Sequence, residues 1–302
     1  MLISKQKLVQ IYFTLRSILY QFRKGFIRLF VSNKNIANVN LDTDHKKLLK
    51  HIRKYGWGLI PHKQLLNSPD NLEPLVSRAY ELLHEQEEMN ELAGELIIPK
   101  KSGDSKKNFK VVINDLFDNE EILNILTDTN IVKIAGDYLG TEPYLNNADV
   151  WWDRYVYEDL EDSQLYHFDG GDPLQVKVFF YLTDVSEKDG PFTFISKTHK
   201  FVKKFGLIYK HSMSHIPDSD ISSNTLSNAQ VFTGGPGDVL FADTNGLHKG
   251  GPISKDSLGR ILLTFTFVSR WAHQNHKNLE QKAFLPFISG TELLSGNYRN
   301  YL

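Results

Sequence analysis

The chain has 302 residues, of which 41% are hydrophobic and 12% aromatic, so it is long enough to bury a sizeable core. Its 35 lysines and arginines nearly balance 36 aspartates and glutamates, which gives no reason to expect nucleic acid as a partner. The complete absence of cysteine excludes disulfides, thiolate metal sites and a cysteine nucleophile, so a transition metal would need imidazole and carboxylate ligands.

The first 41 residues form a basic arm, because the first acidic residue of the chain is Asp42. Apolar residues recur at helical spacing from Leu8 to Leu29 and predict an amphipathic helix, which charged residues interrupt too often for it to cross a bilayer. Two interpretations stay open: a helix packed on the core or a partner, and a peripheral contact of residues 1–33 with an anionic membrane surface. We expect a cytoplasmic protein, with an organellar transit peptide as the alternative.

Residues 42–140 are predicted to be mostly helical. Pro69 and Asp70 are typical of a helix start, and an apolar stripe follows from Leu72 to Leu83. A second helical segment is expected from Glu120 to Ile134. The polar stretch at residues 99–107 has no periodicity and is expected to be an exposed loop.

After Gly140 short β-branched and aromatic runs replace the helical stripes, which predicts a mainly β core of sandwich, barrel or jelly-roll type. The expected strands are Ala148 to Tyr157, Gln164 to Phe168, Gln175 to Leu182, Pro191 to Ile195, Gln230 to Phe232, Asp238 to Ala242 and Arg260 to Ser269. A polar stretch at residues 211–228 is expected to be a solvated loop. We therefore predict one domain over residues 42–302, with the β core at 141–270 and a tail at 271–302.

Two potential metal ligands, His167 and Asp169, stand two residues apart in a predicted strand, so their side chains leave the same face. His248, in a turn after a later strand, is the best candidate for a third ligand. Two histidines and one carboxylate leave coordination positions open, an arrangement that suits non-haem iron(II). The pair alone is weak evidence, because most such pairs are surface polar residues or core histidines with satisfied hydrogen bonds.

Arg260 heads the most apolar run of the chain, and an arginine in that position needs an anionic partner. Its planar fork suits a carboxylate, and the distal carboxylate of 2-oxoglutarate would fit. The alternative is an ion pair with an internal acid such as Asp184 or Asp243.

Residues 165–269 resemble the phytanoyl-CoA dioxygenase family of iron(II)- and 2-oxoglutarate-dependent oxygenases. The resemblance rests on Tyr166-His167-Phe168-Asp169, on residues 177–185 (KVFFYLTDV), on Gly190-Pro191-Phe192 running on to Lys197-Thr198-His199-Lys200, on residues 236–241 (PGDVLF), and on His248 with Arg260. It implies a double-stranded β-helix (a cupin-like jelly roll) preceded by helices. It also implies iron on His167, Asp169 and His248, 2-oxoglutarate held partly by Arg260, and stimulation by ascorbate.

The sequence departs from the family at Lys197-Thr198, where the family has Gly-Ser, and no serine follows Arg260 by two residues. His199 belongs to that turn in the resemblance and is not a metal candidate. Asp169 favours hydroxylation of a small-molecule substrate over halogenation, because halogenating relatives replace this carboxylate with a small residue.

Lys177 lies in a predicted strand, and an inward side chain could contact 2-oxoglutarate or substrate, whereas an outward one would be solvated. Trp151, Trp152 and Arg154 could wall the pocket, although aromatic residues in strands more often belong to a core. An apolar surround is expected from Phe179, Phe192 and Phe265. The remaining histidines of polar segments are expected at the surface: His211, His215, His273 and His276.

Two other functions stay open from the sequence: a non-catalytic binding protein on the same fold, and a cupin-type metalloenzyme that does not use 2-oxoglutarate. Retention of all three ligands together with Arg260 argues against the first. Conversion of 2-oxoglutarate to succinate in the presence of iron(II) and ascorbate would separate both from the oxygenase.

Overall fold

The structure, a computed structural model, describes residues 41–92, 110–113, 116, 119–141, 143–155, 162–169, 174–200, 203, 207, 215–269 and 285–286. For residues 87–92, 110–113 and 285–286 it describes the backbone alone. Residues 1–40 of the basic arm, the expected loop at 99–107, nearly all of the tail and the histidines at 211, 273 and 276 lie outside the described residues.

Helices fill most of the first half of the described chain. The α-helices are α2 (Thr43–Tyr55), α3 (His62–Leu65), α4 (Leu72–Leu92), α5 (Glu120–Leu126), α6 (Thr129–Leu139) and the short α8 (Ser223–Leu226), and the 3-10 turns are η1 (Pro69–Asn71), η2 (Asp162–Gln164) and η3 (Asp218–Asp220). Asp42 and Asp128 cap α2 and α6 by accepting backbone N–H groups of the first turn. Gly56 ends α2 with φ of 94°, a left-handed conformation that favours glycine.

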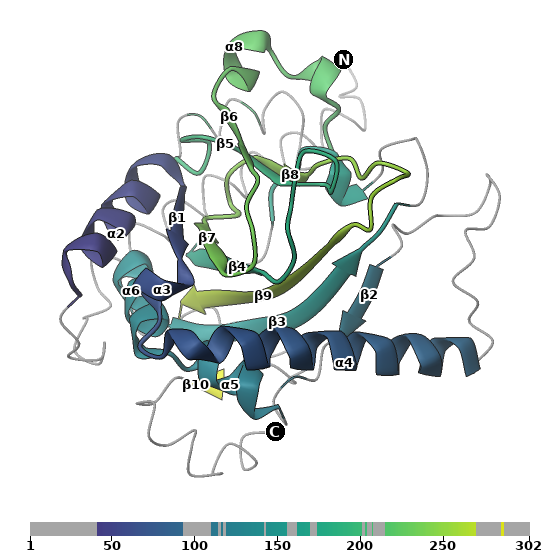
Figure 1. The fold of residues 1–302 in the computed structure, drawn as a ribbon. Helices are drawn as coiled ribbons and strands as arrows, with labels where there is room; N and C mark the ends of the chain where they lie inside the picture. The colour runs from purple at the N-terminus through teal and green to yellow at the C-terminus, as the bar shows by residue number, and fades with distance from the viewer. Residues whose placement is uncertain are drawn as a thin grey trace, which may run out of the picture.

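A large antiparallel sheet forms the centre of the molecule (Figure 1). Its strands, in spatial order, are β1 (Trp57–Pro61), β7 (Asp238–Ala242), β4 (Gln175–Tyr181), β9 (Arg260–Ser269), β3 (Pro143–Asp153) and β10 (Leu285–Pro286), and β2 (Lys110–Ile113) also pairs with β3. A smaller sheet has the order β6 (Ala229–Phe232), β5 (Phe192–Ile195) and β8 (His248–Gly250). Neighbouring strands are mostly far apart in sequence, so the two sheets bring distant residues together.

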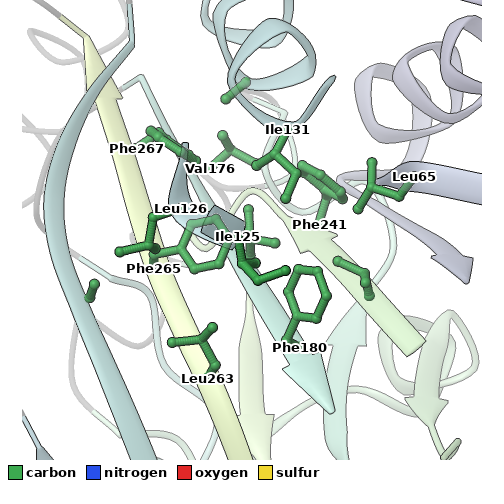
Figure 2. Packing of buried hydrophobic residues seen from close by; sticks show 14 of the residues in the cluster. Leu65, Ile125, Leu126, Ile131, Val176, Phe180, Phe241, Leu263, Phe265 and Phe267 are labelled. Atoms are coloured by element: carbon green, nitrogen blue, oxygen red, sulfur yellow. The ribbon is translucent and has the colours of Figure 1, made fainter. Parts of the chain in front are cut away.

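Side chains of the large sheet alternate between two cores. On β4, Val176, Val178 and Phe180 join a cluster with the helices, and Figure 2 shows Phe180, Phe241 and Phe265 in this cluster beside helical residues such as Ile125 and Ile131. The other face of the large sheet packs against the small sheet through a second cluster. Its members are Phe179, Tyr181, Val185, Phe192, Phe194, Phe232, Leu240, Ala242 and Leu262, with Trp57 and Trp151 packed against them.

The helical prediction for residues 42–140 missed two strands, β1 and β2. β1 follows Gly56 and pairs with β7, nearly two hundred residues along the chain, so no local pattern predicts it. The helix expected from Glu120 to Ile134 is two helices, separated at Asp128, which caps the second. In contrast, the helix start at Pro69 and Asp70 is confirmed as η1 followed by α4.

Most strands of the second half agree with expectation, but His248–Gly250 forms strand β8, where the sequence predicted a turn. Asp238–Ala242 and Arg260–Ser269 have the predicted bounds, whereas β3 begins at Pro143, earlier than predicted. The strand expected from Gln164 to Phe168 is wrong as a continuous strand. Its first residue ends η2, and Tyr166 and His167 each form an isolated bridge. Residues 215–228 of the expected loop contain η3 and α8.

Candidate metal centre

The backbone brings the first and third candidate ligands face to face. His167 and His248 form an antiparallel bridge in which each backbone N–H donates to the other residue's carbonyl, at 2.9 and 3.1 Å. Directly opposed residues of such a pair project their side chains from the same face. The backbone N–H of Asp169 donates to the carbonyl of Thr244, 2.9 Å away, which places the carboxylate at the same point.

His167, Asp169 and His248 could together hold a metal ion, because one ligand atom from each lies within 4.8 Å of the other two. Oδ1 of Asp169 is 3.8 Å from Nε2 of His167 and 3.7 Å from Nε2 of His248. Adjacent ligands at about 2.1 Å from one ion stand roughly 3 Å apart, so a small contraction would complete the site. The structure thus brings together the three predicted ligands.

Each imidazole is held through its other ring nitrogen. Nδ1 of His167 lies 2.9 Å from the carbonyl of Leu165, and Nδ1 of His248 lies 2.9 Å from the carbonyl of Gly246. A carbonyl only accepts hydrogen bonds, so Nδ1 carries the proton and Nε2 keeps its lone pair. This orients both lone-pair nitrogens for a metal.

The charge states of the three groups also suit ligation. Burial lowers the pKa of His248 to about 4 and lowers the pKa of His167, so both imidazoles are neutral at neutral pH. Burial alone would raise the pKa of Asp169, but His248, Lys177 and His167 hold this pKa below its usual value. The site therefore offers two neutral imidazoles and one carboxylate, the forms that bind metal.

Two polar residues that the sequence did not single out support Asp169. The hydroxyl of Thr244 hydrogen-bonds to the Asp169 carboxylate, and Nε2 of Gln175 donates to the same hydroxyl at 2.9 Å. The Thr244 proton is therefore directed at the carboxylate. Thr244 follows β7 and Gln175 begins β4, so their meeting depends on strand pairing that no local motif reveals.

Arg260 lies on the inner face of β9, and its first partner is an acid that the sequence did not suggest. Nε and Nη2 both donate to Oδ2 of Asp153, at 3.2 and 3.1 Å. The expected alternatives Asp184 and Asp243 are wrong as partners, because strand register places Asp153 directly opposite Arg260. Nη1 of Arg260 is buried and has no hydrogen-bond partner among the described residues.

Lys177 points inward. On β4 it alternates with Val176 and Val178, which face the helices, and its ammonium lies 4.3 Å from the centre of the Trp151 ring. Its charge reaches all three candidate ligands, because it contributes to lowering each of their pKa values. Within the part of the chain that the structure describes, no acid forms an ion pair with it. The outward alternative is thereby excluded.

Several other expectations are resolved by strand alternation. Phe179 and Phe192 lie in the cluster between the sheets, as expected. Phe265 does not, because it is on the opposite face of β9 from Arg260 and packs against the helices. Trp151 faces inward, whereas Trp152 borders the helical cluster and stacks with Arg154, whose guanidinium carbon is 3.8 Å from the ring centre.

Two histidines outside the candidate ligand group were also placed. His199 is buried in a turn and its Nε2 lies 3.4 Å from the Arg53 carbonyl, which agrees with the expected turn role. His215 is exposed, as expected, but its ring centre is 5.3 Å from that of His167. The isolated bridge between Tyr166 and Ile216 causes this proximity.

Comparison with known proteins gives structural but not sequence relatives. No protein-family model matches the chain, and no curated protein matches its sequence. The non-heme alpha-ketoglutarate-dependent carbocyclase SnoK of nogalamycin biosynthesis shares 16% identity with a TM-score of 0.51, over 79% of this chain and 87% of that chain. These values show a common fold.

Two further solved structures contain small molecules. The epimerase SnoN, in complex with Fe3+, alpha-ketoglutarate and nogalamycin RO, is 14% identical with a TM-score of 0.50, over 75% of this chain and 84% of that chain. EctD from S. alaskensis, with 2-oxoglutarate and 5-hydroxyectoine, is 14% identical with a TM-score of 0.52, over 79% of this chain and 82% of that chain. The chain thus shares its fold with iron- and 2-oxoglutarate-dependent enzymes.

Among the described residues, no helix combines the length and apolar character that spanning a bilayer requires.

Proposed function

We propose that the chain is a non-haem iron(II)- and 2-oxoglutarate-dependent dioxygenase that hydroxylates an unactivated C–H bond of a small-molecule or lipid-type substrate. The observation that carries the proposal is the convergence of His167, Asp169 and His248 on one point. The fold shared with SnoN and EctD, whose solved structures hold the same 2-oxo acid, supports the choice of cosubstrate. Succinate and carbon dioxide are the expected coproducts.

The fold we propose is the double-stranded β-helix of the phytanoyl-CoA dioxygenase family. Two facing antiparallel sheets with an aromatic cluster between them support it. The bridges of Tyr166 and His167 add a strand-like segment beside β8, which extends the small sheet. We assign residues 42–302 to a single oxygenase domain in the cytoplasm.

The donor set fits iron(II). Two neutral imidazoles and a carboxylate leave room for a bidentate 2-oxo acid and dioxygen on the same ion. The chemistry that iron(II) supplies in such a site is activation of dioxygen, coupled to oxidative decarboxylation of 2-oxoglutarate to succinate and carbon dioxide. Asp169 occupies one position as a ligand, which favours hydroxylation because no position is vacated for a halide.

The protein's own residues position and shield these groups. The carbonyls of Leu165 and Gly246 hold the imidazoles, and Thr244 holds the carboxylate. Phe179 and Phe192, with ring centres 4.7 Å apart, help to exclude water from the space between the sheets. Dry surroundings strengthen the electrostatic contacts of the bound anions.

Arg260 and Lys177 are the proposed partners of 2-oxoglutarate. Arg260 offers Nη1, which is buried and has no hydrogen-bond partner among the described residues. Its guanidinium lies beside Gly250, where an added Cβ would be 3.1 Å from Nη2, and Gly250 is two residues beyond His248 on the same face of β8. Lys177 offers an ammonium near the candidate ligands. An anion that spans from the metal to Arg260 would satisfy both the metal and the buried guanidinium.

The first test is uncoupled turnover. Protein supplied with iron(II), ascorbate, dioxygen and 2-oxoglutarate should form succinate, and the single variants His167→Ala, Asp169→Ala and His248→Ala should each lose both iron and turnover while keeping the fold. A metal ion held by only three side chains is lost when one of them is removed. Phe265→Leu, on the opposite face of β9, is the control and should retain iron. Near-normal iron content and activity in any ligand variant would remove that residue from the site.

The second test concerns the cosubstrate. Arg260→Ala should retain iron and weaken 2-oxoglutarate binding at least about 30-fold, because loss of a partly buried carboxylate partner costs about 2–5 kcal/mol. Lys177→Gln should weaken binding less, because Lys177 is less buried than Arg260. An unchanged affinity in Arg260→Ala would contradict the assignment.

The reaction type is tested separately with a metabolite screen under labelled dioxygen. Hydroxylation incorporates one labelled oxygen atom into the product, whereas epimerisation and ring closure incorporate none.

A further inference from the structure

We infer that Asp153 is a positioning residue that orients Arg260, so that one edge of the guanidinium is reserved for the distal carboxylate of the cosubstrate. The inference rests on the proposed function, since it assumes that Arg260 binds 2-oxoglutarate. It concerns a residue that no sequence motif marks.

Asp153 and Arg260 form an almost enclosed pair. Their side chains are 14% and 9% exposed, and they lie opposite each other in the register of β3 and β9. Oδ2 of Asp153 accepts from Nε at 3.2 Å and from Nη2 at 3.1 Å. One carboxylate oxygen therefore occupies the Nε and Nη2 edge of the guanidinium.

The other edge is left for a ligand. A guanidinium has five N–H donors, and the contacts with Asp153 leave both donors of Nη1 and one of Nη2. Nη1 is buried without a hydrogen-bond partner among the described residues, a state that costs free energy unless an acceptor arrives. The remaining Nη1 and Nη2 edge matches the two oxygens of a carboxylate.

Asp153 also neutralises the charge of Arg260, so a simple electrostatic view would predict tighter cosubstrate binding without it. We expect the opposite. A long side chain released from its partner samples several rotamers, and ordering it again on binding opposes association. Lys177, which has no acid partner among the described residues, still supplies an uncompensated positive charge near the metal ligands.

The test is a calorimetric titration of 2-oxoglutarate into the full-length protein loaded with Mn(II) in place of iron(II). Asp153→Ala should weaken binding about tenfold, because binding must then order an arginine side chain that Asp153 already holds in place in the wild type. Asp153→Asn, which keeps an acceptor oxygen at the same place without the charge, should recover most of the affinity. In the Arg260→Ala background, Asp153→Ala should have no further effect, because it acts through Arg260.

Three controls separate positioning from general damage. Oxalate, which chelates metal but has no distal carboxylate, should bind wild type and Asp153→Ala equally. Asp128→Ala removes another largely buried aspartate, at the start of α6, and should leave 2-oxoglutarate affinity unchanged. Under turnover, Asp153→Ala should raise the KM for 2-oxoglutarate and leave kcat nearly unchanged.

The outcomes distinguish this inference from the proposed function. Equal or tighter 2-oxoglutarate binding by Asp153→Ala overturns the positioning role while the oxygenase proposal stands. Additive losses in the double variant, or an equal loss for oxalate, also overturn it. If the metal-loaded wild type binds no 2-oxoglutarate, the proposed function fails and the inference fails with it.

Discussion

Lys197 adopts a backbone conformation that favours glycine. Its φ is 69°, and its N–H donates to the carbonyl of Tyr55 at 2.7 Å, so the turn before His199 is tied to the end of α2. This is the position where the resembled family has glycine. Lysine in place of glycine therefore leaves residue 197 in a strained backbone conformation.

Lys197→Gly should stabilise the protein by about 0.5–1 kcal/mol, because relief of about 1–2 kcal/mol of left-handed strain exceeds the greater entropy of glycine in the unfolded chain. The shift in the midpoint of urea unfolding measures it. Lys197→Ala is the matched control, since it removes the ammonium but keeps Cβ, and it should give no gain. Equal stabilisation by both variants would assign the effect to the charge.

Gly250 provides the space in which the Arg260 guanidinium lies. A Cβ at this position would be 3.1 Å from Nη2 of Arg260 and 3.7 Å from the Ser163 carbonyl oxygen. Gly250→Ala should therefore shift the guanidinium by a few tenths of an ångström and weaken 2-oxoglutarate binding on the order of threefold.

The matched control is Gly235→Ala, in the turn before β7 and away from Arg260. Its Cβ would be 3.1 Å from Oδ1 of Asp184, the same distance as that between the Gly250 Cβ and Arg260. Calorimetry on the Mn(II)-loaded variants measures both affinities. A similar loss in the two variants would show that the effect is not specific to Arg260.

At the scale of single residues, the ligand group was predictable because its information is partly local. Two-residue spacing places His167 and Asp169 on one face wherever the chain is extended, even though the structure has only isolated bridges there. Asp153, Thr244 and Gln175 were not predictable. Each reaches its partner through strand register, which residue type and spacing do not encode.

At the scale of elements, helix α6 depends on a buried cap. Oδ1 of Asp128 accepts from Asn130 N at 2.9 Å, and Oδ2 accepts from Asn67 N at 2.8 Å. The cap therefore joins the start of α6 to the segment after α3. Burial raises the pKa of Asp128, because it disfavours the charged carboxylate. The hydrogen bonds from the backbone N–H groups stabilise the charged form and offset part of that cost.

Asp128→Ala should destabilise the protein by about 2 kcal/mol, because it leaves buried backbone donors without acceptors. Equilibrium urea unfolding measures the loss. Asp42→Ala, at the exposed cap of α2, should cost less because water can satisfy its donors. A larger loss at Asp42 than at Asp128 would contradict the role of burial.

Elements of the second half were predictable where both faces of a strand are buried. β9 is buried at every residue and β4 at nearly every residue, so their continuous apolar runs stand out in the sequence. β1 is a short edge strand with an alternating burial pattern and ends at Pro61, which gives only a weak local signal. Its pairing with β7 decides its structure.

At the scale of the whole molecule, the described fold starts at Leu41, the last residue of the basic arm. Leu41 is 5% exposed and belongs to the helical core cluster, and Asp42 caps α2. Residues 1–40 of the arm lie outside the described residues, so the two interpretations of the arm stay predictions. Removal of residues 1–33 leaves every described contact in place.

We expect deletion of residues 1–33 to abolish binding to anionic phospholipid vesicles and to preserve uncoupled succinate formation, because every proposed ligand lies beyond Tyr166. Vesicle co-sedimentation measures vesicle binding, and a succinate assay measures turnover.

High salt should weaken vesicle binding only in part, since it screens charges but not burial of Phe22, Phe26 and Phe30. Arg23→Glu with Lys24→Glu, which keeps the apolar face, should lose preference for anionic over neutral vesicles. If the full-length protein ignores both vesicles, or the truncated protein unfolds, the arm packs on the core or a partner and the membrane interpretation is wrong.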